Sequence, residues 1–119
     1  MVHTEDEEGV IRTEDGDVVA REYGVADSFV TRALGVMFRR SFPGDALVFV
    51  FSRERRVGIH MLFVFFPIDV LFLDEDGVVV SKKTLRPWLG YASARASTVI
   101  EMPADASEGV EEGDRLIIE

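Results

Sequence analysis

Short apolar runs separated by turn-forming residues dominate this chain, and they predict strands rather than long helices. Val10–Arg12 and Val18–Tyr23 flank the tetrapeptide Glu-Asp-Gly-Asp. An Asp-Gly pair between two apolar runs is typical of a β-hairpin. Ile68–Leu73 and Val78–Lys82 flank a second acidic turn, Asp-Glu-Asp-Gly, and predict the clearest hairpin of the chain.

Three further apolar runs are predicted as strands, at Ala46–Phe51, Ser97–Met102 and Leu116–Ile118. The run Ile59–Phe66 is apolar throughout, so its periodicity does not distinguish a strand from a helical turn. Pro67 ends this run. Alternation along a strand would place Phe63 and Phe65 on the same face.

One or two short helices complete the predicted fold. A helix is predicted from the N-cap pair Asp27-Ser28 to Ala33 or Leu34, where a glycine ends it. Residues 103–113 have the pattern of a helical turn closed by glycines. Short strands with frequent turns predict a mainly β fold, a compact antiparallel β barrel or sandwich.

Length and composition fit one domain. With 119 residues, 47% of them hydrophobic, the chain can form a core without disulfides. We expect residues 1–9 to be a loose acidic terminus and residues 10–119 to form a single β domain. No cysteine is present, and the two histidines, His3 and His60, leave almost no ligands for a metal. We therefore expect no metal and no cofactor. Neither a Gly-rich phosphate loop nor a Gly-x-Ser-x-Gly motif occurs.

Charge is distributed unevenly along the chain. The formal net charge is −9, and the acidic excess lies at the two ends while the centre is mildly basic. Nucleic acid would be repelled by this net charge, so we expect no nucleic-acid partner. Only Lys82 and Lys83 are lysines, and all other basic residues are arginines. Such an acidic, lysine-poor composition is similar to that of proteins from salt-loving archaea.

The sequence gives no sign of a membrane or export segment. The acidic N-terminus lacks the basic and apolar regions of a signal peptide. Val57–Leu73 is the most apolar stretch, but it is short for a span and contains His60, Pro67 and Asp69. We expect a soluble, cytoplasmic protein with no membrane partner.

Four segments carry a resemblance to a known family. They are Arg32–Arg39, Ala46–Phe51, Ile59–Met61 followed by Pro67–Phe72, and Ile100–Met102 followed by Gly113–Arg115. In order and spacing they resemble the motifs of an uncharacterised family, domain of unknown function 192. One of those motifs is Arg-x-x-Gly-Leu-Met-x-Arg, and another is Phe-Trp-Met, five residues, then Pro-Leu-Asp-Ile. The resemblance implies a compact, mainly β domain, and the family has no established activity.

Two departures limit what can be transferred from the family. His60 stands where the family usually has tryptophan, so a packing role competes with a titrating one. Leu62-Phe63-Val64 stands where many members have Lys-Asn-Thr, so a role that needs that amide or hydroxyl does not transfer. The His60-Met61 version resembles an archaeal branch.

Asp69 is the main candidate for chemistry. It lies inside an apolar run, and a buried carboxylate must be paired, hydrogen-bonded or protonated. As a functional group, Asp69 would face a pocket as an acid, a base or a ligand anchor. As a structural group, it would accept hydrogen bonds from backbone amides or from an arginine, and the pairing of an Arg segment with the Asp segment in the family motifs implies Arg32 or Arg39 as that arginine.

The favoured function is a binding module for a small polar or anionic ligand, in a monomer or weak homodimer. The expected ligand-binding residues are Arg32, Arg39, His60, Met61, Asp69 and Trp88. Trp88 follows a proline in irregular chain, where an aromatic ring can frame a ligand site or cover the core. An enzyme that uses Asp69 as acid or base is one alternative, and a protein-interaction domain with a Phe-rich face is another. Whether the protein is an enzyme stays open.

Overall fold

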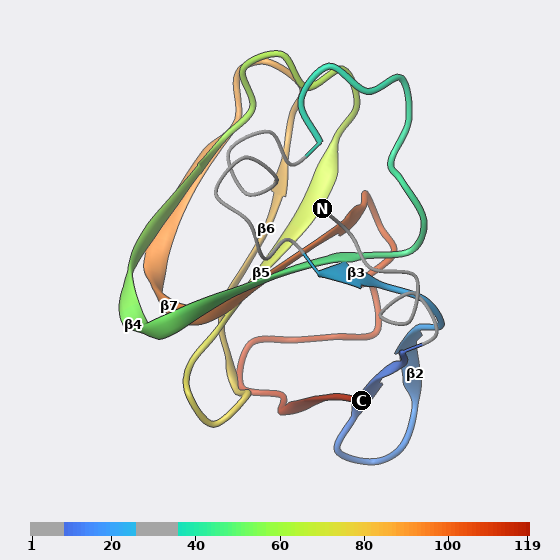
Figure 1. Ribbon diagram of the computed structural model, residues 1–119, viewed down its shortest axis with the longest axis vertical. Coiled ribbons are helices and arrows are strands. Elements are labelled where there is room, and N and C mark those ends of the chain that lie inside the picture. Colours follow the sequence, from blue (N-terminus) through green and yellow to red (C-terminus); the bar gives the residue numbers. More distant parts are fainter. Residues whose placement is uncertain (1–8, 26–35) are drawn as a thin grey trace.

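The computed structural model describes residues 9–25 and 36–119, which contain eight strands and no helix. Figure 1 shows their arrangement. The strands are β1 (Ile11–Thr13), β2 (Val18–Ala20), β3 (Gly24–Val25), β4 (Leu47–His60), β5 (Ile68–Leu73), β6 (Val79–Leu85), β7 (Tyr91–Pro103) and β8 (Leu116–Ile118). β3, β4, β7, β5 and β6 form one sheet in that order, and β2, β1 and β8 form a second, smaller sheet.

Strand β5 lies inside the larger sheet and is buried along its whole length. Its five apolar residues belong to two apolar clusters, one on each face. Val70 and Phe72 belong to the first cluster, and Leu71 and Leu73 belong to the second. A sheet covered on both faces explains why this run is apolar almost without interruption.

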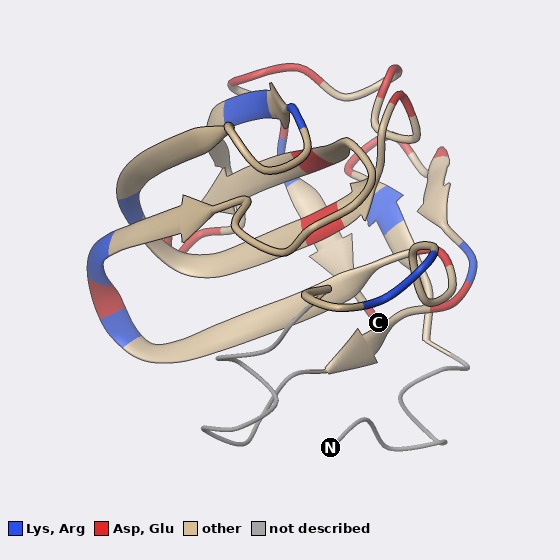
Figure 2. Ribbon diagram, turned by 90° about the horizontal axis from the view of Figure 1, so that it is seen from above, with Lys and Arg blue, Asp and Glu red and all other residues tan. Residues whose placement is uncertain are grey.

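Strands β4 and β7 are long and bend together. Their antiparallel register runs from Leu47 opposite Glu101 to Val50 opposite Thr98, and resumes at Arg55 opposite Ala96. The extra residues of β4 at this register shift form a bend, where basic and acidic residues alternate (Figure 2). Beyond the bend, residues 55–60 and 91–96 form a two-stranded ribbon, here called the arm.

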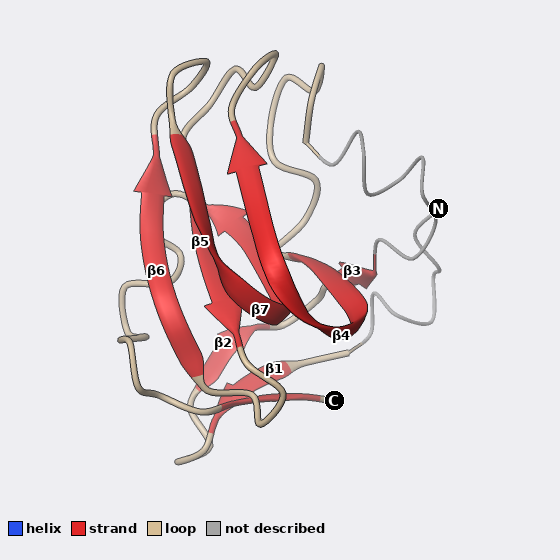
Figure 3. Cartoon of the chain, turned by 90° about the vertical axis from the view of Figure 1, so that its left-hand side faces the viewer, coloured by secondary structure: helices blue, strands red, loops and turns tan. Residues whose placement is uncertain are grey.

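The molecule has three layers, as the side view in Figure 3 shows. The arm contributes Val57, Ala92 and Ala96 to the same apolar cluster as Val70 and Phe72, so it packs on the first face of the larger sheet. The smaller sheet covers the second face, where its residues join the cluster of Leu71 and Leu73. Packing of these layers removes the apolar residues of both clusters from water.

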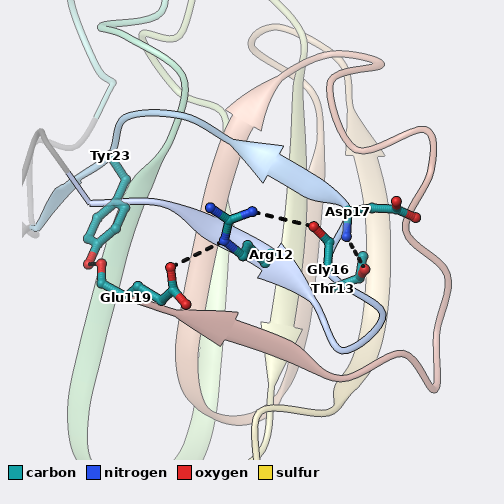
Figure 4. A network of polar contacts seen from close by, with 6 residues as sticks. All are labelled: Arg12, Thr13, Gly16, Asp17, Tyr23 and Glu119. Atoms are coloured by element: carbon teal, nitrogen blue, oxygen red, sulfur yellow. Dashed lines mark hydrogen bonds and ion pairs between the residues drawn. The ribbon is translucent and has the colours of Figure 1, made fainter.

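Polar contacts tie the two chain ends of the smaller sheet together (Figure 4). Arg12 on β1 forms an ion pair of 3.2 Å with Glu119 beyond β8, and the Tyr23 hydroxyl donates a hydrogen bond of 2.6 Å to the Glu119 carbonyl. Gly16 holds a positive φ of 97° in the turn between β1 and β2, as its Asp-Gly sequence predicts.

The mainly β prediction is confirmed, and so are both predicted hairpins. The sheets do not close into a barrel, because the larger one has β3 and β6 as its two edges. The predicted helix at residues 27–34 lies outside the described ranges. Residues 104–113 form turns rather than a helix, since the backbone hydrogen bonds within this segment span three residues and do not propagate, and the Gly113 amide donates to Val79 on β6 instead. In the described residues no helix is long and apolar enough to cross a membrane.

Candidate functional site

Asp69 lies on β5 and points into the second face of the larger sheet, where only 1% of it is exposed. Its Oδ1 atom accepts a hydrogen bond of 2.8 Å from the Thr84 hydroxyl. Its Oδ2 atom accepts bonds from Ser107, at 2.5 Å from the hydroxyl and 3.2 Å from the backbone amide. Burial alone would raise the pKa of Asp69. The hydrogen bonds from Ser107 and Thr84 together lower it by more than burial raises it, so the pKa of this carboxylate lies below its ordinary range.

Lys82, on the neighbouring strand β6, also binds the segment that contains Ser107. The Lys82 ammonium donates hydrogen bonds to the carbonyls of Ser107 (2.7 Å) and Val110 (2.6 Å), both in the loop that joins β7 to β8. The Lys82 amide donates a bond of 3.0 Å to the Glu112 carboxylate. Asp69 and Lys82 therefore fasten residues 104–115, here called the β7–β8 loop, to the sheet by hydrogen bonds between their charged groups and neutral groups of the loop.

This geometry fits the structural interpretation of Asp69. A general acid or base needs access to substrate and, at neutral pH, a raised carboxyl pKa. Asp69 is sealed, and the direction of its pKa shift is the opposite one. The donors to Asp69 are Thr84 and Ser107 rather than Arg39, and Arg32 lies outside the described residues.

The other expected ligand residues are dispersed. Met61 is fully buried beneath the loops at the end of the arm. His60, exposed at the last position of β4, accepts a hydrogen bond of 3.1 Å at Nδ1 from the Leu62 amide. Arg39 lines a cavity of about 330 Å³ together with Glu22 and Asp45. The six residues therefore do not form one site in the described chain.

Four aromatic side chains from three loops form the most distinctive exposed feature, here called the aromatic tip: Phe38, Phe63, Phe65 and Trp88. Phe38 stacks on Phe63 with 4.9 Å between ring centroids. Trp88 contacts Phe63 at 5.2 Å and Phe65 at 5.6 Å. Between 41% and 59% of each of these residues is exposed. The loops that carry the rings lie together at the top of Figures 1 and 3.

More apolar side chains extend the exposed surface around the tip. Leu62 and Leu89, which neighbour the rings in the chain, are 52% and 74% exposed. Tyr91, also exposed, lies over Gly58 on the paired strand, where a Cβ atom would be 2.8 Å from the tyrosine hydroxyl. A cluster of exposed apolar side chains at one end of a folded domain marks an interaction site more often than an accident of composition.

The backbone of the tip is held in an unusual conformation. Phe38, Phe63 and Trp88 have φ angles of 65°, 61° and 65°, in the left-handed region that L-residues seldom adopt. A backbone bond of 2.8 Å from the Phe38 amide to the Phe63 carbonyl joins two of the loops, and Met61 donates one of 3.1 Å to Gly90 in the third. Such conformations persist where the surroundings fix them, and they are concentrated at ligand-binding sites.

Charge at the tip differs from that of the whole chain. Residues 36–43, 60–67 and 86–91 contain three arginines and no lysine, aspartate or glutamate. The turns at the opposite end, residues 14–17, 74–77 and 104–115, hold most of the described acids and contact one another through backbone hydrogen bonds. The protein therefore has an acidic end and an aromatic, basic end.

Only part of the tip could be recognised in the sequence. Trp88 was identifiable as a loop aromatic beside a proline. Phe63 and Phe65 lie in an apolar run that resembles a strand, yet the structure places both in the turn after β4. Phe38 stands at an unspecified position within the Arg-x-x-Gly-Leu-Met-x-Arg motif and carries no signal of its own. The contact among these rings depends on the bend of β4 and β7, which no local pattern predicts.

Comparison with known proteins gives a family and a fold. The family model described as "Uncharacterized ACR", domain of unknown function 192, matches residues 10–118. A UPF0127 protein of Pyrococcus horikoshii is 44% identical over 100 residues, which cover 80% of this chain and 85% of the relative.

Two crystal structures are similar to this fold. A Sinorhizobium meliloti protein, named as a candidate transcription regulator, has a TM-score of 0.79 and 25% identity over 92% of this chain and 91% of its own. A Novosphingobium aromaticivorans protein of unknown function has a TM-score of 0.76 and 21% identity, covering 92% of this chain and 82% of its own.

Proposed function

The chain belongs to the uncharacterised family domain of unknown function 192, and we propose that it is a recognition module that binds another protein through the aromatic tip. The observation that carries this proposal is the contact among four half-exposed aromatic rings from three loops. Burying these rings against a partner would remove a large apolar area from water, which is the main driving force of protein association.

The composition of the tip supports a protein partner. The centres of protein interfaces are enriched in aromatic residues, methionine and arginine, and depleted in lysine, aspartate and glutamate. The three tip segments have this composition. Residues that dominate binding energy are most often Trp, Tyr and Arg, and Trp88 stands at the centre of the ring contacts.

The left-handed backbone of the tip supports the same proposal. Loops that must order on binding lose affinity through conformational entropy. Here hydrogen bonds between loops fix Phe38 and Phe63 before any partner arrives. The rings therefore offer a preorganised surface.

Selection from a displayed random peptide library tests the proposal. Wild-type protein should select binders that lose at least about tenfold in affinity with the Phe63→Ala/Trp88→Ala double variant. Val80→Ala, which truncates an exposed valine on β6 outside the tip segments, is the matched control and should bind normally. Binders that ignore the double variant, or a library that yields no tip-dependent binder, would contradict the proposal.

A small anionic ligand is the second candidate, supported by the cavity beside Arg39. Its volume of about 330 Å³ suits a small metabolite, and an arginine can bind a carboxylate or phosphate with two parallel hydrogen bonds. Titration of isotope-labelled protein with a metabolite mixture, in high potassium chloride, distinguishes the two sites. Amide shifts confined to residues 22–24, 39 and 43–47 would support this candidate, and shifts in the tip alone would oppose it.

The composition supports the further proposal that the protein works in a salt-rich cytoplasm. Acidic residues crowd the turns opposite the tip, and salt screens the repulsion among them. The melting temperature should therefore rise when potassium chloride is increased from low to molar concentrations. A melting temperature that falls or stays constant would argue against adaptation to salt.

A further inference from the structure

We infer that the partner of the aromatic tip is an acidic polypeptide segment, whose carboxylates meet Arg40 and Arg86 while an apolar side chain packs against the rings. This inference rests on the proposed function and adds the chemistry of the partner to it. It is argued from the charges that surround the tip.

Arg40 and Arg86 flank the tip in the chain. Arg40 follows Phe38 by two positions, and Arg86 precedes Trp88 by two positions. The Arg86 carbonyl accepts a hydrogen bond of 3.0 Å from the Gly90 amide, so its loop is a closed turn of defined geometry. Both arginines are exposed, and neither side chain has a hydrogen bond or ion pair to another residue in the described ranges.

Three other arginines of the described chain form ion pairs with acids. Arg12 pairs with Glu119 at 3.2 Å, and Arg115 pairs with Glu14 at 3.6 Å. Arg95 at the arm lies 3.9 Å from Glu54. These pairs balance charge within the molecule, whereas the tip segments contain no acid that could pair with Arg40 or Arg86.

The charge that favours an acidic partner is local to the tip. The net charge of −9 opposes an acidic chain at long range, so the attraction must come from short-range contacts with the tip arginines. At short range, arginine forks bind carboxylates bidentately, and such contacts survive salt screening better than distant ones.

A second copy of this chain fits the tip poorly. A two-fold dimer through the tip would place the same arginines of both copies at one interface, with no acid between them. Lipid surfaces are usually recognised by four to eight basic residues, and the tip segments offer three. An acidic protein segment supplies both the apolar contact and the opposite charge.

The test uses the peptide binders that depend on the tip, compared by sequence and by salt response. Tip-dependent binders should be enriched in Asp and Glu beside an aromatic residue or leucine. The Arg40→Gln/Arg86→Gln variant should bind them about 10- to 100-fold more weakly, with a flatter salt dependence. The matched control is Arg53→Gln/Arg55→Gln at the β4 bend, which changes two exposed arginines outside the tip segments and should bind normally.

Each other outcome has a definite meaning. Neutral or basic binders, or binders that ignore Arg40→Gln/Arg86→Gln, would overturn this inference while the proposed function stands. The absence of any tip-dependent binder would overturn both. A dimer seen by light scattering and abolished by Phe63→Ala/Trp88→Ala would assign the tip to self-association instead. Tip-dependent sedimentation with phosphatidylserine vesicles would assign it to lipid.

Discussion

The two faces of the larger sheet each bury a carboxylate, and the two carboxylates differ in their hydrogen bonds and in the direction of their pKa shifts. On the second face, Asp69 accepts hydrogen bonds from Thr84 and Ser107, and its pKa lies below the ordinary range. On the first face, Glu101 pairs in register with Leu47 and Val70, and burial raises its pKa to about 7. Its Oε1 atom has no hydrogen-bond partner among the described residues.

The two faces differ in their outer layers as well. The face of Asp69 is covered by the β7–β8 loop, which Asp69 and Lys82 hold with short bonds. The face of Glu101 is covered by the arm and the loops beneath the aromatic tip. The buried carboxylate is thus satisfied on the face that the β7–β8 loop covers, while the buried carboxylate of the other face keeps an oxygen without a partner among the described residues. Asp69, the main candidate for chemistry in the sequence, thus holds a loop on the covered face.

The largest effect is expected at Asp69. Asp69→Asn should lower the free energy of unfolding by about 3 kcal/mol at neutral pH, because the new amide group would face the Ser107 donors. Denaturant titration measures the change. Ser107→Ala should lower it by about half as much, and a double-mutant cycle should reveal coupling. Equal stability of Asp69→Asn and wild type would break the contrast between the faces.

Acid should weaken the same attachment. Because the pKa of Asp69 is lower in the folded protein, its stabilisation is present above the ordinary aspartate pKa. It is lost as the pH falls through the folded-state value. The β7–β8 loop should therefore exchange its amide hydrogens faster in acid in the wild type. Asp69→Asn should lack this component of the pH response.

The pH dependence of stability that comes from Glu101 should have the opposite sign to that from Asp69. With a pKa raised from 4.5 to about 7, its contribution favours the folded state at low pH and is lost between those values. Glu101→Gln should therefore gain about 2 kcal/mol of stability near pH 9 and almost nothing near pH 4. Unfolding curves at the two pH values measure the difference. A loss of stability near pH 9 would mean that the carboxylate has a stabilising partner.

Lys82 should contribute less than Asp69. Lys82→Met keeps the apolar stem but removes two bonds to the carbonyls of the β7–β8 loop, so we expect a loss of roughly 1–2 kcal/mol. Lys83→Met is the control, since Lys83 is the exposed neighbour on the same strand. Similar losses for both variants would show that charge alone, rather than the loop contacts, sets the stability.

The smallest effect on stability is expected at the tip. Trp88→Ala should change the free energy of unfolding by less than about 1 kcal/mol, because 43% of Trp88 is exposed and it lies in a loop. The same variant is expected to weaken tip-dependent binding. A loss of several kcal/mol in denaturant titration would instead assign Trp88 to the core.

The sequence predicts the features of this fold that depend on neighbouring residues. Acidic Asp-Gly turns predict both hairpins, and the isolated carboxylate of Asp69 in an apolar strand predicts a satisfied buried acid. The long bent strands escape prediction because a register shift depends on the partner strand. In the sequence Phe63 and Phe65 resemble core residues of a strand. In the structure β4 ends before them, so both lie in the loop that follows the arm. Of the four rings of the tip, only Trp88 is recognisable in the sequence as a loop aromatic, because it follows a proline.

The strand ends beneath the tip also make the fold a presentation scaffold. The pairing of His60 with Tyr91 fixes the start and end of two loops, and the packing of Met61 and Leu85 fixes their bases. Exposed residues beyond these anchor points contribute little to the core, so we expect their exchange to leave the register of both sheets unchanged, provided that the buried Val64 is kept. Grafting loops of other sequence onto the same anchors would therefore create binders of new specificity, with the folding information left in the strands.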